Sequence, residues 1–348
     1  MEVPQGYQAM IKTSVILLAY GQEGFIRAAM DSLMNQEMTP HEVIVVDDNS
    51  PDATAEIIES FIGLKGQQWY FIRKESNEGV VAAVRSALGV ASGDVIIIAA
   101  GDDISGPSRI AKTTEFFEGH PKSFGLILGA SVIDAVGRLT GQTVNCPSRL
   151  PAQLSVSSLS GHDVMPGLHA CGASSAFRRE VFDNFGPVRD DVYADDRIYA
   201  LRAILLGNCT FLPDLMVSWR NHGANLSFIS GRARGPHLVR YFEGCVADIE
   251  QHLKDLEFWQ KSQGRQRPTE NLEEFITELN AERLRLRLLV ACHRPGLDVV
   301  NVLRDAMKWL ASGGRKSGRF AGLIKALAQM IIPYPLQRML VAARKRND

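Results

Sequence analysis

The chain has 348 residues, of which 45% are apolar and 22% are charged, and its formal net charge is −1. This composition is typical of a globular protein with two domains, or with one large domain and an extension. The near-zero charge gives no reason to expect a nucleic-acid partner. The N-terminus does not resemble a signal peptide, and no apolar run approaches the roughly 18 residues that a spanning helix needs.

The cysteines exclude two further classes of protein. There are five, they are scattered along the chain, and no two are spaced as CxxC: Cys146, Cys171, Cys209, Cys245 and Cys292. This pattern favours neither a disulfide framework nor a zinc site, and it is typical of a reducing compartment. We therefore expect a cytoplasmic protein.

The first 120 residues alternate short apolar runs with longer runs of helical periodicity. The apolar runs predict strands over 14–20, 42–50, 68–74 and 94–100, and the periodic runs predict helices over 24–36, 52–62, 78–93 and 108–120. Continuous apolar strands separated by helices are typical of a parallel sheet that helices cover on both faces. The predicted fold class is therefore α/β, with a Rossmann-like, mostly parallel sheet.

The second half of the chain is less regular. It predicts a strand over 125–134, a long Ser/Pro/Gly-rich loop over 137–167, a helix over 174–185, a helix over 195–206 and a strand over 210–219. From about residue 232 helix-forming residues dominate. We predict a catalytic domain over 1–231 and a helical C-terminal extension over 232–348.

Polar residues follow the predicted strands at the edge where parallel sheets bind ligands. Tyr20, Asp48, Asn77 and the pair Asp102–Asp103 all lie just beyond strand ends. A polar turn that starts the next helix would explain any one of these clusters. Several clusters on one edge favour a binding site.

The sequence lacks both GxGxxG after its first strand and a GxxxxGK[ST] loop, so neither of these motifs would hold a phosphate. Carboxylates do not bind a diphosphate directly, because both are anions. A divalent ion between them resolves this conflict, and Mg²⁺ and Mn²⁺ both prefer oxygen ligands. His222 lies in a Gly/Asn-rich loop and is a candidate metal ligand or phosphate donor.

Two other motifs have a structural and a functional interpretation. Arg85 lies in a predicted helix, where it is either a solvated surface side chain or a cation aimed at a diphosphate. Asp195 and Asp196 start a helix, where acids stabilise the helix dipole. One of them would alternatively serve as a general base.

Seven motifs, in order, resemble the family-2 glycosyltransferases with the GT-A fold over roughly residues 12–230. They are "SVILLAY", "IVVDDNSPDAT", "NEGVVAAVRSALGVASGD", "AAGDDISGPSRI", "CGASSAFRREVF", "ADDRIYALR" and "WRNHGANLS". The resemblance implies that a nucleotide-sugar lies across the strand ends.

The resemblance also implies roles for individual residues. Asp48 would contact the base with Tyr20 and Asn77 nearby, and Arg85 would lie near the base or the diphosphate. Asp102 and Asp103 match the metal-binding DxD region, and His222 matches a histidine near the diphosphate. Asp196 would be the catalytic base, with Asp195 as its neighbour. The chain departs from the common "LDADD" pattern, because Ala100 replaces its first acid.

The chemistry implied is a metal-dependent, inverting hexosyl transfer from a nucleoside-diphosphate sugar, with UDP-sugars favoured, to an acceptor hydroxyl. Bacterial surface polysaccharide synthesis on a saccharide or lipid-linked acceptor is the expected setting. Two alternatives remain at this point: a nucleotidyltransferase that makes nucleotide-sugars, and a non-catalytic nucleotide-binding protein on the same fold.

The C-terminal tail, residues 315–348, carries eight Lys or Arg and one acid, together with apolar stretches. It is either a helix packed on the protein or an interfacial segment attracted to anionic lipids. The second interpretation predicts a peripheral association with the inner face of the plasma membrane.

Overall fold

The computed structural model describes residues 11–63, 68–145, 153–159, 172–223, 225, 236–264, 269–293 and 299–311. These residues form two compact units. The first contains the described residues of 1–156, 166–190 and 195–224, and the second contains those of 157–165, 191–194 and 225–348. The domain boundary expected near residue 232 stays a prediction. The tail over 315–348 lies outside the described residues.

The first unit begins with the alternating strands and helices that the sequence predicted. These elements are β1 (Thr13–Ala19), α1 (Ile26–Met34), β2 (Glu42–Asp47), α2 (Thr54–Ile62), β3 (Trp69–Arg73), α3 (Val80–Leu88), β4 (Val95–Ala100), β5 (Ile104–Ser105) and α4 (Arg109–Gly119). Strands β1 to β4 are all parallel, and their order is β3-β2-β1-β4. The predicted α/β class with a mostly parallel sheet is confirmed.

The remaining strands extend the sheet beyond β4. They are β6 (Ser123–Asp134), β7 (Leu139–Val144), β8 (Gln153–Ser155), β9 (Ser175–Arg178) and β10 (Asn208–Asn221), with helices α6 (Glu180–Asp183) and α7 (Asp195–Leu206) between them. Two short 3₁₀ turns, Val156–Ser158 and Gly172–Ser174, complete this half. Strand β9 is antiparallel to both β4 and β6, and β6 is parallel to β10. Strands β6 and β10 therefore run in the same direction as β4.

Two predictions for this half are wrong in part. Residues 175–178, expected to be helical, form strand β9, and the helix that follows is limited to Glu180–Asp183. Ala176 and Phe177 fill a slot between β4 and β6, where both are buried, and this pairing outweighs the local helical pattern. The expected loop over 137–167 contains two strands, β7 and β8, which pair with β6 and β10.

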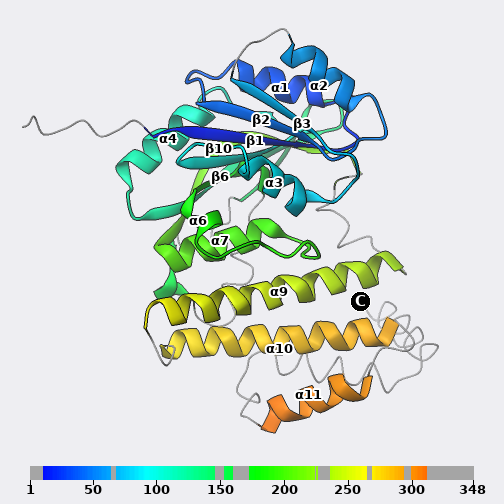
Figure 1. Cartoon of the computed structure of the whole chain (residues 1–348), viewed down its shortest axis with the longest axis vertical. Coiled ribbons are helices and arrows are strands. Elements are labelled where there is room, and N and C mark those ends of the chain that lie inside the picture. The colour runs from blue at the N-terminus through cyan, green and yellow to red at the C-terminus, as the bar shows by residue number, and fades with distance from the viewer. Residues whose placement is uncertain are drawn as a thin grey trace, which may run out of the picture. The chain divides into compact units, whose positions relative to one another are not determined.

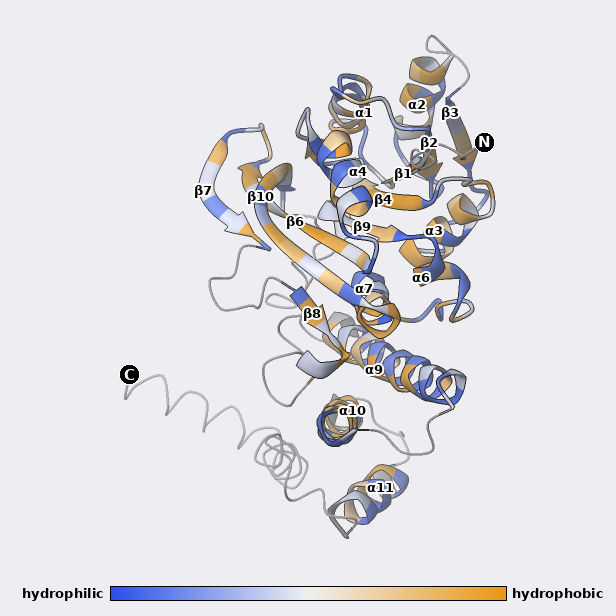
Figure 2. Ribbon diagram, turned by 90° about the vertical axis from the view of Figure 1, so that its left-hand side faces the viewer, coloured by the Kyte–Doolittle hydropathy of each residue, from blue (hydrophilic) through white to orange (hydrophobic). Residues whose placement is uncertain are grey.

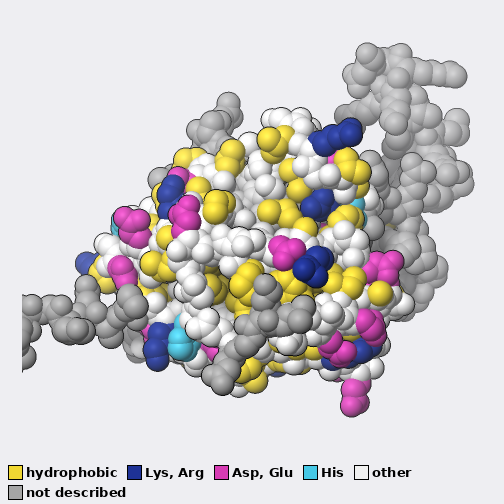
Figure 3. Space-filling view, turned by 90° about the horizontal axis from the view of Figure 1, so that it is seen from above, with side chains coloured by type: hydrophobic (Ala, Val, Ile, Leu, Met, Phe, Trp, Pro, Cys, Tyr) yellow, Lys and Arg dark blue, Asp and Glu magenta, His cyan; other side chains and the backbone are white. Residues whose placement is uncertain are grey.

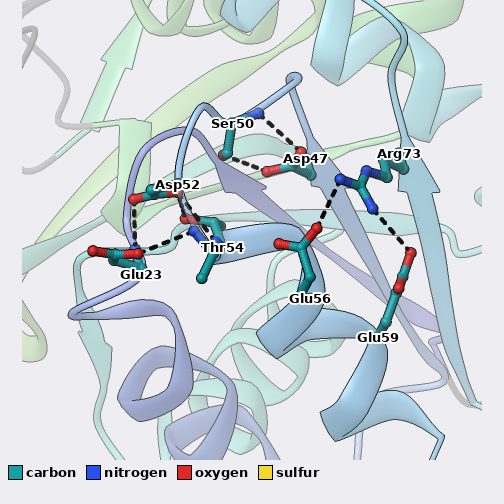
Figure 4. Close-up of polar contacts among 9 residues, drawn as sticks. Glu23, Asp47, Ser50, Asp52, Thr54, Glu56, Glu59 and Arg73 are labelled. Atoms are coloured by element: carbon teal, nitrogen blue, oxygen red, sulfur yellow. Dashed lines mark hydrogen bonds and ion pairs between the residues drawn. The ribbon is translucent and has the colours of Figure 1, made fainter.

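Helices cover both faces of the sheet, with α1 and α2 on one face and α3, α6 and α7 on the other (Figure 1). Successive side chains of a strand point to opposite faces of the sheet. On the face that α1 and α2 cover, Val15, Leu17 and Val45 pack with these helices in one buried cluster. The middle strands are apolar along much of their length (Figure 2). Arg73 of β3 also pairs with Glu56 and Glu59 of α2 (Figure 4).

The second unit is helical. Its helices are α9 (Pro236–Ser262), α10 (Glu270–His293) and α11 (Val299–Ala311), and α9 and α10 lie side by side (Figure 1). Their buried apolar residues include Leu256, Leu272, Phe275 and Leu279. None of the helices in the described ranges is long and apolar enough to cross a bilayer.

Candidate active site

The sheet brings the sequence-predicted residues to one edge. Tyr20 follows β1, Asp48 follows β2, Asn77 follows β3, the pair Asp102–Asp103 follows β4 and His222 follows β10. These five strands run in the same direction, so the carboxyl end of each lies at this edge. In the view of Figure 3, acidic, basic and apolar side chains of the described residues are interspersed over the surface, in keeping with the near-zero net charge.

The loops after β1 and β2 are joined by bonds between side chains and backbone (Figure 4). Gly21 N donates to Ser50 Oγ at 2.9 Å, and Glu23 N donates to Asp52 Oδ2 at 3.1 Å. In return, Ala53 N donates to Glu23 Oε2 at 3.0 Å. Reciprocal bonds of this kind fix both loops without regular structure. They hold the loop that carries Tyr20, a residue that is 49% exposed.

Asp48 is buried and makes several polar contacts. Its carboxylate accepts bonds from Glu78 N at 3.1 Å and Gly79 N at 2.7 Å, and it forms an ion pair with Lys74 at 3.1 Å. Burial would lower the pKa of Lys74, but bonds to Glu78 and Asp48 outweigh burial and raise that pKa above its usual value. Asp48 therefore fixes the turn that starts α3, where Gly79 has a φ of +88° that favours glycine. The adjacent Asn77 is exposed at the same edge.

Asp102 and His222 converge from positions far apart in the chain. Asp102 Oδ2 lies 3.0 Å from His222 Nε2, and both side chains are mostly buried but still reach solvent. The His222 ring packs against Phe25, with 5.0 Å between the ring centroids. The geometry therefore places His222 against Asp102, and the role of His222 as a metal ligand stays a prediction.

Asp103 faces a different environment from its neighbour. Its Oδ1 accepts a bond from Arg220 N at 2.8 Å. Burial, and then the charge of Asp102, raise the pKa of Asp103 well above its usual range, although Arg220 and Arg109 act in the opposite direction. Asp103 as a metal ligand stays a prediction.

Arg220 is a component of the site that the sequence reasoning did not identify. Its Nε donates to the backbone oxygen of Asp102 at 2.7 Å, and its Nη1 donates to that of Ala135 at 3.2 Å. Its guanidinium lies 4.9 Å from the centre of the Phe25 ring. Arg220 thus ties the acidic turn to the end of β6 and to the loop after β1. The only sequence signal was its position two residues before His222.

Asp195 and Asp196 form the first turn of α7, as predicted. Asp196 Oδ2 accepts a bond from Gly172 N at 3.1 Å, and Asp196 Oδ1 accepts one from Arg197 N at 2.8 Å. Burial raises the pKa of Asp196 to about 6, against the lowering effect of Arg197. A carboxylate with this pKa is ionised at neutral pH and still basic enough to take a proton, which is what a general base requires.

Arg85 contacts protein groups in this structure. It donates to the backbone oxygen of Val188 at 3.2 Å and forms an ion pair with Asp190. Its side chain is 48% exposed. The expected contact of Arg85 with a base or diphosphate stays a prediction, and the structure gives Arg85 a second role in holding the segment before Asp195.

The residues at this edge fit a divalent ion that shares its coordination with a phosphate. Asp102 Oδ2 and His222 Nε2 supply an oxygen and a nitrogen that lie 3.0 Å apart. Among the described residues no group of three or more His, Cys, Asp or Glu forms a complete metal cage. Mg²⁺ and Mn²⁺ are commonly held by one or two protein groups with phosphate oxygens and water completing the shell.

The architecture, a mostly parallel sheet with acids at its carboxyl edge, matches the GT-A fold that the sequence resemblance implied. Residues 14–186 match the model of "Glycosyl transferase family 2". The chain belongs to this family.

Solved structures with similar folds support this assignment at the level of the fold. Residues 1–349 of S. aureus TarS superpose with a TM-score of 0.60 at 18% identity, over 92% of this chain and 88% of that one. The same TarS fragment has been solved in complex with UDP and with UDP-GlcNAc. Mannosyltransferase PcManGT from Pyrobaculum calidifontis, in complex with GDP-Man and Mn²⁺, gives a TM-score of 0.52 at 18% identity, over 93% and 88% of the two chains.

The match to a sequence relative covers a smaller part of both chains. An uncharacterized protein of Mycobacterium tuberculosis is 28% identical over 215 residues, which cover 60% of this chain and 58% of the relative. The chain therefore spans less than two thirds of that relative's length.

Proposed function

We propose that this protein transfers a sugar from a nucleoside-diphosphate sugar to a hydroxyl group of a saccharide acceptor, with inversion at the anomeric carbon. The observation that carries this proposal is the pairing of Asp102 with His222 at the carboxyl edge, in a chain whose Asp196 has a raised pKa. Membership of the family and the nucleotide-sugars bound by TarS and PcManGT support it.

In the proposed reaction, Asp196 accepts the proton of the acceptor hydroxyl as that oxygen attacks the anomeric carbon. The bonds from Gly172 N and Arg197 N orient its carboxylate. One displacement is sufficient for inversion, so a second carboxylate nucleophile is not required. The proposed role of Asp195 is to support this helix start through its charge.

At the other end of the donor, Asp102 and His222 would hold a divalent ion, Mn²⁺ or Mg²⁺. Such an ion offsets the negative charge that develops on the leaving diphosphate. The base of the nucleotide would lie beside Tyr20 and Asn77, on the turn that Asp48 fixes. A UDP-sugar is the preferred donor in this proposal, with a GDP-sugar as the second candidate. The setting we favour is bacterial surface polysaccharide synthesis.

The experiment that tests this function supplies the purified chain with UDP- and GDP-sugars, Mn²⁺ and a panel of saccharide acceptors. Release of nucleoside diphosphate together with a new glycoside supports transfer, and NMR of the product gives the anomeric configuration. Release of pyrophosphate would instead indicate a nucleotidyltransferase. Nucleotide binding without turnover, unchanged by Asp196→Asn, would indicate a non-catalytic binding protein.

A further inference from the structure

One face of helix α9 contacts the segment that leads into α7. Tyr241, Gly244 and Asp248 are spaced by three and four residues, so they share a face of the helix. The segment that they contact is Tyr193–Ala194, which directly precedes Asp195 and Asp196 in the chain. All five of these contacting residues belong to the second compact unit.

The strongest contact is a pair of hydrogen bonds to one carboxylate oxygen. Asp248 Oδ1 accepts bonds from Tyr193 N at 2.7 Å and from Ala194 N at 3.2 Å. Asp248 is only 3% exposed. A buried acceptor that takes two consecutive backbone N–H groups fixes the direction of the chain at that point, in the same way that a capping side chain does at a helix start.

Gly244 allows the segment to approach the helix closely. A Cβ atom at this position would lie 2.8 Å from Tyr193 Cβ and 3.3 Å from Tyr193 N. The Tyr193 ring then meets the Tyr241 ring edge to face, with 4.8 Å between the centroids. Glycine in the middle of a helix is unfavourable. The close approach of Tyr193 explains why a glycine stands at this position.

We infer that Tyr241, Gly244 and Asp248 of α9 are positioning residues for the proposed base Asp196. They act through the backbone of Tyr193 and Ala194, which is joined to Asp195 by a single peptide bond. The expected effect on turnover rests on the proposed function. The contacts that α9 makes with residues 193–194 do not depend on that function. The helical extension then has a role in turnover, because it fixes where the base helix begins.

Two variants separate the hydrogen bonds from the charge. Asp248→Ala removes the acceptor, whereas Asp248→Asn keeps an Oδ1 that accepts from both N–H groups. Because misplacement of a reacting group by about 1 Å costs up to about 100-fold in rate, we expect Asp248→Ala to lower kcat by about 10- to 100-fold. Binding of nucleoside diphosphate, measured by calorimetry, should be unchanged, and Asp248→Asn should restore most of kcat. The matched control is Glu257→Ala, which removes an exposed carboxylate from the same helix.

Gly244→Ala provides an independent test that does not weaken the helix. Alanine favours helix formation, so the variant should fold, and its Cβ should displace Tyr193. We expect lower kcat with unchanged nucleoside diphosphate binding. Wild-type kcat in both Asp248→Ala and Gly244→Ala would overturn the inference, and so would an Asp248→Asn variant as impaired as Asp248→Ala.

Hydrogen exchange tests the two hydrogen bonds from residues 193 and 194 to Asp248 directly, and this measurement does not require activity. The amides of residues 193 and 194 should exchange faster in Asp248→Ala than in the wild type or in Glu257→Ala. If the wild-type protein transfers no sugar from any donor, the proposed function fails while this measurement still decides the inference. Unchanged exchange at these amides would overturn it.

Discussion

The raised pKa of Asp196 predicts a specific pH dependence of turnover. With a pKa of about 6, the carboxylate is about 90% ionised at pH 7 and about 10% ionised at pH 5. If Asp196 is the base, kcat/KM should fall about tenfold between these two pH values. An aspartate at the usual value of 3.8 would remain ionised over the whole interval and give almost no change.

The assay is nucleoside diphosphate release under subsaturating donor, in buffers of constant ionic strength, because kcat/KM reports the free enzyme. Asp196→Asn should reduce turnover by orders of magnitude at every pH. Asp183→Asn, which removes an exposed carboxylate of α6, is the control and should keep the wild-type profile. A flat profile between pH 5 and pH 7 with active protein would refute the assignment of Asp196 as the base.

Two predictions concern the groups that hold the edge loops. Arg220→Met removes the donors to the backbone oxygens of Asp102 and Ala135 and should lower the free energy of unfolding by about 2–4 kcal/mol in urea titrations; wild-type stability would contradict the role we give this side chain. Asp52→Ala removes the acceptor for Glu23 N and Thr54 N and should cost about 1–2 kcal/mol at pH 7. Burial alone would raise the pKa of Asp52, but the hydrogen bonds from Thr54 and Glu23 outweigh burial and lower that pKa below 3.8. The stabilisation that Asp52 provides is therefore present above pH 3.8 and is lost as the pH falls through the pKa of the folded state. The difference in stability between wild type and variant should therefore shrink in acid, and a constant difference would contradict it.

The sequence predicted the parts of the fold that depend on local pattern. The apolar runs placed β1 to β4, and the acids at its start with Gly207 after its end placed α7 at the bounds that the structure shows. Strand β9 was missed because its four residues become a strand only through pairing with β4 and β6 on both sides. Such pairing depends on residues about 50 to 80 positions away, which a local pattern does not contain.

The site shows the same division. Residues that follow strand ends were found because the topology of a parallel sheet brings them together. Arg220 and Asp248 were missed because their roles depend on backbone groups far along the chain. A side chain that binds a carbonyl or an amide leaves no sequence motif at its partner, since every residue except proline offers both groups.

The two adjacent acids provide a last prediction, because the structure separates their roles. Asp103 directs Oδ1 to the backbone of Arg220, and an asparagine at that position keeps an acceptor there. Asp102 instead meets His222, where an asparagine would remove the negative charge that a divalent ion requires. Calorimetry should therefore show that Asp102→Asn loses Mn²⁺-dependent binding of nucleoside diphosphate, whereas Asp103→Asn keeps most of it. Equal losses would mean that both carboxylates bind the ion, as the DxD resemblance implied, and would contradict this separation of their roles.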